Sequence, residues 1–287
     1  MLKVVLRYFA TLVSLVALAA CTPYVIVNAF VPSDDYTLST AAYGADPRQQ
    51  LDVYRPRDQR GTAPVVVFFY GGSWQSGNRG DNRFVGEALA SRGIVAVIAD
   101  YRVYPQVRYP DFVRDSAGAV AWTLREIGNY GGDPARVFVM GHSAGAYNAA
   151  MIALDPRWLK AAGAPPTRLA GWIGLAGPYD FLPVIDKELK RVFDFPGTPP
   201  DSQPLAHADS RSPPALLVAA VSDGFVDPQR NTAQMAAKLD GAGVHVSTHM
   251  LDNVNHVTLI AALSKPFRGI APVLDYVADF VGSTPVR

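Results

Sequence analysis

The chain has 287 residues, of which 49% are hydrophobic and 18% are charged. This composition is typical of one globular domain with a sizeable apolar core. The formal net charge is +1 and no basic run stands out, which argues against a nucleic-acid partner, because binding a polyanion requires clustered Lys and Arg.

The first twenty residues are typical of an export signal. Lys3 and Arg7 precede an apolar run, residues 8–20, which ends in Leu-Ala-Ala immediately before Cys21. This run is too short for a comfortable membrane span and follows the charged-then-apolar order of a secretory signal. It resembles a bacterial lipoprotein signal, in which the cysteine is lipidated and becomes the mature N-terminus. Because Cys21 is the only cysteine, it cannot form an internal disulfide, and attachment is favoured over redox chemistry.

We therefore expect a signal peptide over residues 1–20, a tether over 21–35 and a single domain over 36–287. The resemblance implies a lipid anchor at Cys21, membrane association, and a place in the bacterial cell envelope at the periplasmic or outer-membrane face. The alternative is an ordinary signal peptide, or an uncleaved anchor, with an incidental cysteine.

The predicted domain begins with a hairpin and continues with alternating buried strands and helices. Continuous β-branched and aromatic runs, such as residues 64–70, are typical of strands that are buried on both faces of a parallel sheet. Strands are expected at 36–43, 50–54, 64–70, 94–99, 137–140, 170–175, 215–221 and 244–251, and helices at 82–91, 112–127, 229–239 and 270–280. This alternation predicts an α/β fold with right-handed crossovers. Residues 177–214 break the pattern with prolines and short mixed runs, which favours a small lid-like excursion over a second domain.

The candidate nucleophile lies in the sequence Gly141-His142-Ser143-Ala144-Gly145. Four apolar residues precede it and a small-residue, helix-forming stretch follows, which is the strand, sharp turn and helix of a nucleophile elbow. In such a turn Gly141 and Gly145 are needed because any Cβ would collide with the neighbouring strand and helix. Ser143 is therefore the predicted nucleophile, with an ordinary structural turn as the alternative.

A serine nucleophile needs a base, and five histidines are available. They are His142, His207, His245, His249 and His256. In the nucleophile-elbow architecture the order along the chain is Ser, then Asp or Glu, then His. His142 adjoins the serine but diverges from it around the turn, and two others lie in a predicted strand. His256 follows the last strand in a loop, where a mobile imidazole can reach the strand ends, so we predict it as the base.

Two carboxylates compete to orient that base, and both follow the strand predicted at 215–221. Asp223 is nearer the strand and precedes Gly224, which permits a tight loop. Asp227 precedes Pro228 and equally suits the N-cap of the next helix. We favour Asp223.

For the oxyanion, the Gly-rich segment after residues 64–70 and the residue after the nucleophile would supply backbone N–H donors, which points to Gly72, Ser73 and Ala144.

Taken together, these motifs resemble the α/β-hydrolases of the esterase/lipase group, near the hormone-sensitive-lipase-like and BD-FAE carboxylesterases. The matching pieces are Tyr70-Gly71-Gly72-Ser73-Trp74, Asp100-Tyr101-Arg102, Gly132-Asp133-Pro134, the serine motif, residues 223–228 and His256. The resemblance implies a mostly parallel sheet of about eight strands with helices on both faces, no metal or other cofactor, and ester hydrolysis through an acyl-enzyme. One departure is Tyr70, where that family usually has His; tyrosine can still hydrogen-bond, but on a longer and flatter side chain.

We therefore expect a serine carboxylesterase whose partner is a small to medium carboxylic ester. An arylformamidase, a feruloyl or acetyl-xylan esterase and a dipeptidyl-type peptidase are the enzyme alternatives, although no acidic pair that would grip a peptide amine is identifiable. A non-catalytic envelope lipoprotein that retains the scaffold is the alternative from another class, because fold alone does not fix function. The sequence does not indicate an oligomeric state or a preferred acyl chain.

Overall fold

The computed structural model describes residues 27–32, 34–165 and 169–285. The predicted signal peptide and Cys21 lie outside these residues. Of the predicted tether, the described part packs on the domain: Val27 is buried, and Asn28 Nδ2 donates to the carbonyls of Gly80 (3.2 Å) and Asp81 (3.0 Å). Within the described ranges, none of the helices combines the length and hydropathy that crossing a bilayer requires.

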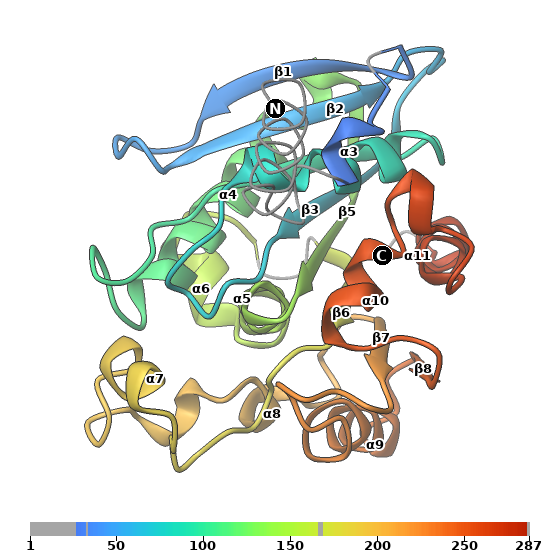
Figure 1. Ribbon diagram of the computed structural model, residues 1–287. Coiled ribbons are helices and arrows are strands. Elements are labelled where there is room, and N and C mark those ends of the chain that lie inside the picture. The colour runs from blue at the N-terminus through green and yellow to red at the C-terminus, as the bar shows by residue number, and fades with distance from the viewer. Residues whose placement is uncertain (1–26, 33, 166–168, 286–287) are drawn as a thin grey trace, which may run out of the picture.

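The described residues form one eight-stranded, mostly parallel sheet, as the sequence predicted (Figure 1). Its strands are β1 (Tyr36–Ala42), β2 (Gln50–Pro56), β3 (Ala63–Phe69), β4 (Val95–Ala99), β5 (Gly132–His142), β6 (Leu169–Leu175), β7 (Ala215–Ala220) and β8 (Val246–Leu251). Their order is β1-β2-β4-β3-β5-β6-β7-β8. The β1–β2 hairpin is antiparallel and joins β4 antiparallel, whereas the remaining neighbours are parallel. The carboxyl ends of the parallel strands therefore meet at one edge, where sites form in such sheets.

Helices cover both faces of this sheet. They are α3 (Arg83–Ala90), α4 (Asp111–Glu126), α5 (Ala144–Leu154), α6 (Pro156–Ala161), α7 (Lys187–Val192), α8 (Pro204–His207), α9 (Gln234–Gly241), α10 (His256–Ala261) and α11 (Val273–Ser283), with short turns η1 (Arg79–Asn82), η2 (Ile127–Tyr130), η4 (Pro200–Ser202), η5 (Gln229–Ala233) and η6 (Lys265–Phe267). In Figure 1, α4, α5 and α6 lie on one side of the central strands, and α3 and α11 lie on the other. The central strands are thereby shielded from water, which explains their continuous apolar runs.

The strand predicted at 137–140 begins earlier than expected. Gly131 has a φ of 82°, but Gly132 already belongs to β5 and pairs with Ala63 of β3. The register between the two strands then shifts before Val65 pairs with Val137. Four residues of β5 thus lie opposite a single residue of β3, so β5 begins early through an irregular segment.

The excursion over residues 177–214 carries α7, η4 and α8, and its described residues add no strand to the sheet. Polar contacts fasten it to α5 and α6. Tyr147 Oη donates to the carbonyl of Ser202 at 2.6 Å, and the Arg157 guanidinium bridges Asp155 and Asp201 at 2.7 and 2.8 Å. The segment is thus held against the carboxyl edge of the sheet.

Candidate active site

The turn at Ser143 joins β5 to α5 as a strained elbow. Ser143 has φ 54° and ψ −124°, a conformation that residues with a side chain rarely adopt. A Cβ on Gly141 would lie 2.1 Å from the Gly145 carbonyl oxygen, and one on Gly145 would lie 1.9 Å from the Phe69 carbonyl oxygen. The predicted collision at both glycines is confirmed. Ser143 N–H also donates to the Leu175 carbonyl at 2.9 Å, which ties the turn to the end of β6.

His256 is the first residue of α10, and the prediction of a mobile loop position was wrong. Asn255 caps this helix: its Oδ1 accepts from the N–H groups of Val257 (3.0 Å) and Thr258 (2.9 Å), while Thr258 Oγ1 accepts from the N–H of Asn255. This reciprocal capping box fixes the first turn. The pattern Asn-x-x-Thr was visible in the sequence and was the signal for it. His256 is 7% exposed, so its imidazole is held rather than mobile.

Asp223 holds the imidazole of His256. Oδ2 of Asp223 lies 2.7 Å from Nδ1 of His256, and the carboxylate side chain is 1% exposed. Because a carboxylate only accepts, Nδ1 carries the proton, which leaves Nε2 of a neutral ring with its lone pair. Oδ1 of Asp223 accepts from the backbone N–H groups of Phe225 (2.8 Å) and Val226 (2.9 Å), so both oxygens are held in place.

Asp227, the competing carboxylate, is engaged elsewhere. Its Oδ1 accepts from the N–H groups of Gln229 (2.9 Å) and Arg230 (3.2 Å) at the start of η5. This is the helix-capping role that the sequence offered as the alternative for this residue. The structure therefore brings Asp223, rather than Asp227, to His256.

His142 connects the elbow to His256. Its Nε2 lies 2.9 Å from the His256 carbonyl oxygen, and the two ring centroids are 4.8 Å apart. Because a carbonyl only accepts, Nε2 of His142 carries the proton. Burial, and after it the neighbouring His256, lowers the pKa of His142 to about 3, so this ring stays neutral near pH 7. Sequence reasoning excluded His142 as a base and missed this connection.

The loop after β3, residues 70–77, passes directly against the nucleophile. A Cβ on Gly71 would lie 3.0 Å from the Ser143 Cβ and 3.2 Å from the His142 carbonyl oxygen. Ala144 is the first residue of α5, so its N–H has no acceptor inside the helix. The loop that contains Gly72 and Ser73 therefore lies beside Ser143 at Gly71, near the N-terminus of α5. The oxyanion role of Gly72, Ser73 and Ala144 stays a prediction.

Trp74 anchors this loop in an aromatic cluster. It is 2% exposed, and its Nε1 donates to Asn148 Oδ1 at 2.9 Å. Its ring lies edge-on to those of Tyr147 (5.1 Å) and Phe193 (4.8 Å), with Phe181 at 6.2 Å. Phe181 and Phe193 belong to the excursion, so that segment packs on the loop beside the elbow.

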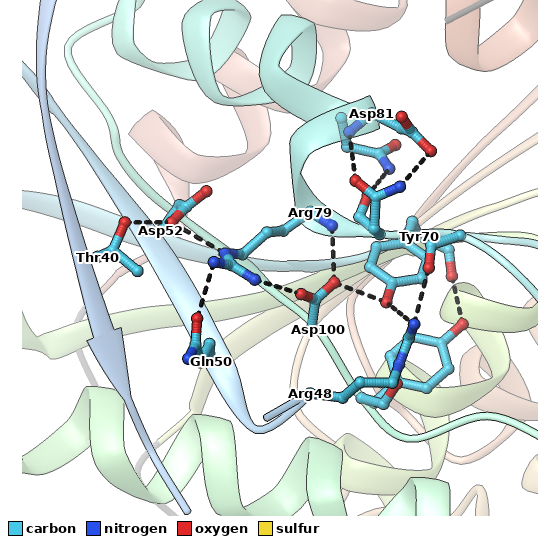
Figure 2. Close-up of polar contacts among 12 residues, drawn as sticks. Thr40, Arg48, Gln50, Asp52, Tyr70, Arg79, Asp81 and Asp100 are labelled. Carbon is cyan, nitrogen blue, oxygen red and sulfur yellow. Dashed lines mark hydrogen bonds and ion pairs between the residues drawn. The ribbon is translucent and has the colours of Figure 1, made fainter. Parts of the chain in front are cut away.

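Tyr70 replaces the histidine that the resemblance led us to expect, and it is fully engaged (Figure 2). Its hydroxyl donates to Asp100 Oδ1 at 2.8 Å and accepts from Arg48 Nη2 at 3.0 Å. Its ring stacks on that of Tyr101 with the centroids 4.9 Å apart. The sequence did not point to Arg48, because a lone arginine in a predicted turn is ordinary surface composition.

This arrangement offers a hydroxyl at a strained elbow, an imidazole oriented by a buried carboxylate, and backbone donors beside the hydroxyl. Those are the parts that acyl transfer through a covalent intermediate requires. Among the described residues, no group of three His, Cys, Asp or Glu side chains is placed to hold a metal ion.

Comparisons with known proteins give relatives of the same kind. A probable isoprenylcysteine alpha-carbonyl methylesterase of Arabidopsis thaliana is 29% identical over 258 residues, which are 82% of this chain and 53% of the relative. Esterase LipC of Mycobacterium tuberculosis is 32% identical over 195 residues, which are 61% of this chain and 48% of the relative. The chain thus spans about half the length of these curated relatives.

A solved esterase from Pyrobaculum calidifontis superposes with a TM-score of 0.75 at 22% identity, covering 92% of this chain and 90% of that one. At this identity the likeness establishes the α/β-hydrolase fold. A sequence model of the BD-FAE family matches residues 51–239, which is more than half of the chain. The chain therefore belongs to the BD-FAE family.

Proposed function

We propose that this chain is a serine carboxylesterase that hydrolyses small to medium carboxylic esters through an acyl-enzyme. The observation that carries the proposal is the 2.7 Å contact between His256 Nδ1 and Asp223 Oδ2, in a chain whose Ser143 occupies a strained elbow. The esterase names of its relatives support the same reaction class. Because the chain spans only about half the length of those relatives, their substrates are not assigned to it.

The proposed reaction starts with attack of Ser143 Oγ on the ester carbonyl carbon while His256 Nε2 takes the hydroxyl proton. The N–H groups of Gly72, Ser73 and Ala144 stabilise the oxyanion, each contributing about 3 kcal/mol to the transition state. Collapse of the tetrahedral intermediate breaks the ester C–O bond, and His256 returns the proton to the leaving alkoxide. Water then attacks the acyl-enzyme carbonyl with His256 again as base. The bond to Ser143 Oγ breaks, His256 returns the proton to that oxygen, and the carboxylic acid leaves. Asp223 stays ionised and orients the ring throughout.

Two measurements test this function. Fluorophosphonate labelling followed by mass spectrometry should place the adduct on Ser143, and p-nitrophenyl esters of increasing acyl length should be hydrolysed with a preference for short to medium chains. Ser143→Ala should abolish both signals and leave the circular dichroism spectrum unchanged, because a methyl group fits at the elbow. Ser39→Ala, at an exposed serine on β1, is the matched control and should behave as wild type. An adduct on another residue, or turnover by Ser143→Ala, contradicts the proposal.

We further propose that Cys21 carries a lipid anchor that keeps the domain at the membrane of the cell envelope. Support comes from the charged-then-apolar order of residues 1–20 and from the small residues before a lone cysteine. One acyl chain binds a membrane only marginally, whereas the several chains of a lipoprotein cysteine anchor firmly. The full-length chain should partition into detergent, and Cys21→Ser should move it to the aqueous phase. Unmodified Cys21 in the envelope fraction contradicts this proposal.

A further inference from the structure

We propose that Arg48 is a positioning residue that clamps both ends of the loop formed by residues 70–77 and thereby holds the donors of Gly72 and Ser73 at Ser143. Arg48 lies in the connection between β1 and β2 and makes contacts 22 to 53 positions away along the chain. The inference rests on the proposed esterase function, because the loop acts in catalysis only if an oxyanion forms beside it.

The loop needs support from outside itself. Three consecutive residues have positive φ: Gly72 at 120°, Ser73 at 53° and Trp74 at 58°. For residues with a side chain, such conformations cost about 1–3 kcal/mol each and persist only where the surroundings enforce them. Inside the loop, the Gly72 carbonyl accepts from the N–H groups of Gln75 (2.9 Å) and Ser76 (3.2 Å), which curls the segment but does not fix its two ends.

Arg48 binds those ends directly (Figure 2). Its Nη2 donates to the Tyr70 hydroxyl at 3.0 Å and to the Gly77 carbonyl at 2.7 Å, and these are the first and last residues of the loop. Its Nε donates to the Tyr101 carbonyl at 3.0 Å, just beyond β4. A single planar guanidinium therefore joins both ends of the loop to the neighbouring strand end, which a flexible ammonium could not do in one geometry.

The direction of each hydrogen bond makes these contacts interdependent. Because arginine only donates, Tyr70 must give its own proton to Asp100 Oδ1, at 2.8 Å. Asp100 also accepts from the backbone N–H of Arg79 at 2.7 Å and from its Nη1 at 2.5 Å. Burial raises the pKa of Tyr70, so its hydroxyl stays protonated and remains a donor. In a variant without Arg48, the Tyr70 hydroxyl oxygen would lose the donor that orients its own O–H group towards Asp100.

Close packing brings the two ends within reach of one side chain. Gly77 has a φ of 105°, and a Cβ there would lie 2.6 Å from the Tyr70 ring. The backbone of Gly77 consequently lies against this ring, and Arg48 Nη2 reaches both the Gly77 carbonyl and the Tyr70 hydroxyl. Ring contact and guanidinium together close the loop, and the closed loop places Gly71 against Ser143.

Arg48→Met tests the inference, because methionine keeps an apolar stem and removes every donor. We expect kcat for p-nitrophenyl acetate to fall about 10- to 100-fold with KM changed less than about threefold, since oxyanion contacts strengthen only in the transition state. Affinity for a trifluoromethyl ketone, whose adduct with a serine carries the same oxyanion, should weaken in parallel. Arg48→Lys, which keeps one charged donor, should recover part of kcat.

Arg136→Met is the matched control. Arg136 is also a half-buried arginine whose Nη2 donates to a backbone carbonyl, that of Val281 at 3.0 Å, but it lies in the half of β5 remote from Ser143. With each variant assayed below its own unfolding temperature, Arg136→Met should lower stability and leave kcat and ketone affinity unchanged. A general loss of stability is thereby separated from misplacement of the loop.

A double-mutant cycle with Tyr70→Phe provides the second test. If Arg48 acts through Tyr70, the double variant should lose little more kcat than Arg48→Met alone. Additive losses in kcat overturn the inference. So does an Arg48→Met enzyme with wild-type kcat and wild-type ketone affinity, whatever its stability. Neither outcome affects the proposed function. A wild-type chain that neither hydrolyses esters nor forms an adduct on Ser143 overturns the proposed function, and this inference with it.

Discussion

The nucleophile elbow and the oxyanion loop lie side by side, but different kinds of contact hold them. At the elbow, backbone presses on backbone: a Cβ on Gly145 would lie 1.9 Å from the Phe69 carbonyl oxygen. At the loop, the side chains of Arg48, Tyr70 and Asp100 converge from three separate segments. The elbow therefore depends on the absence of side chains at two positions of a five-residue motif, whereas the loop depends on polar side chains that are distant in the chain. Substitutions in the two regions should consequently fail in different ways.

The largest effect is expected for Gly145→Ala. β3 cannot move away without breaking its pairing with β4 and β5, and α5 begins directly after Ser143 at the end of β5, so the variant should give little folded, soluble protein, as judged by circular dichroism and gel filtration. Gly282→Ala is the control, because nothing lies within 4 Å of a Cβ at this helical position. It should fold with equal or slightly higher stability. Well-folded Gly145→Ala would show that the elbow is not fixed by backbone contact.

Asp223→Asn should separate activity from folding. An amide keeps the shape but allows the wrong tautomer of His256, and in a serine protease triad the same exchange lowers kcat about ten-thousand-fold. The unfolding temperature should change little. The measurements are kcat and the thermal midpoint of the variant and of the wild type.

Asp227→Ala is the matched variant on the same connection. Loss of the cap at η5 should lower the free energy of unfolding by about 1 kcal/mol and leave kcat within a few-fold. The reverse pattern, a catalytic collapse at Asp227 with active Asp223→Asn, contradicts the assignment.

Asp100→Asn should impair activity and stability together, which distinguishes the loop from the elbow. Asp100 accepts from Tyr70 and Arg79, and its side chain is only 6% exposed. We expect kcat to fall about tenfold, and the free energy of unfolding to fall by about 2 kcal/mol, because hydrogen bonds to a buried charge are lost. Asp111→Asn, at an exposed ion pair with Arg114, should change neither quantity measurably. Wild-type kcat in Asp100→Asn would show that its network supports the fold alone.

His142 should have no effect at neutral pH, and its contribution should become visible only as a pH dependence of stability in acid. Its folded pKa is about 3 and its ordinary value is 6.5, so between these pH values the unfolded chain binds one more proton at this site. Stability from this residue is therefore complete above pH 6.5 and is lost as the pH falls towards 3, by up to about 1.4 kcal/mol per unit. His142→Gln keeps a donor for the His256 carbonyl and should remove this part of the pH dependence of the free energy of unfolding. The free energy is measured by urea unfolding between pH 4 and 7, and the same pH dependence in wild type and variant contradicts the prediction.

Patterns that are local in the chain predicted most of the fold and the elbow. The apolar runs of β3, β4 and β7 and the spacing of Gly141 and Gly145 around Ser143 are short patterns that can be read without knowing the rest of the fold. The choice between Asp223 and Asp227 was also open to sequence reasoning, because only the second precedes a proline and suits a cap. In the structure each carboxylate accepts from backbone N–H groups two and three positions ahead. They differ only in what their second oxygen reaches.

Contacts between distant segments could not be predicted in this way. Nothing near Arg48 distinguishes it from other arginines in polar turns, and its partners Tyr70, Gly77 and Tyr101 are placed by the strand order, in which β2 lies beside β4 rather than β3. The attachment of His142 to His256 similarly depends on where α10 enters the site. His256 was identified correctly as the partner of Asp223, but its backbone state was misjudged because the cap at Asn255 was overlooked.

The antiparallel hairpin of β1 and β2 has a consequence for recombining this protein with its relatives. It lies at the edge of the sheet, where it could be expected to be removable or exchangeable without any effect on the parallel strands. Yet its connection supplies the guanidinium that reaches Tyr70 and Gly77. A chimaera with β3 and its loop from one parent and the hairpin from another would separate Arg48 from the partners with which it belongs. Crossover points that keep these contacts within one parent lie before residue 36 or after residue 101.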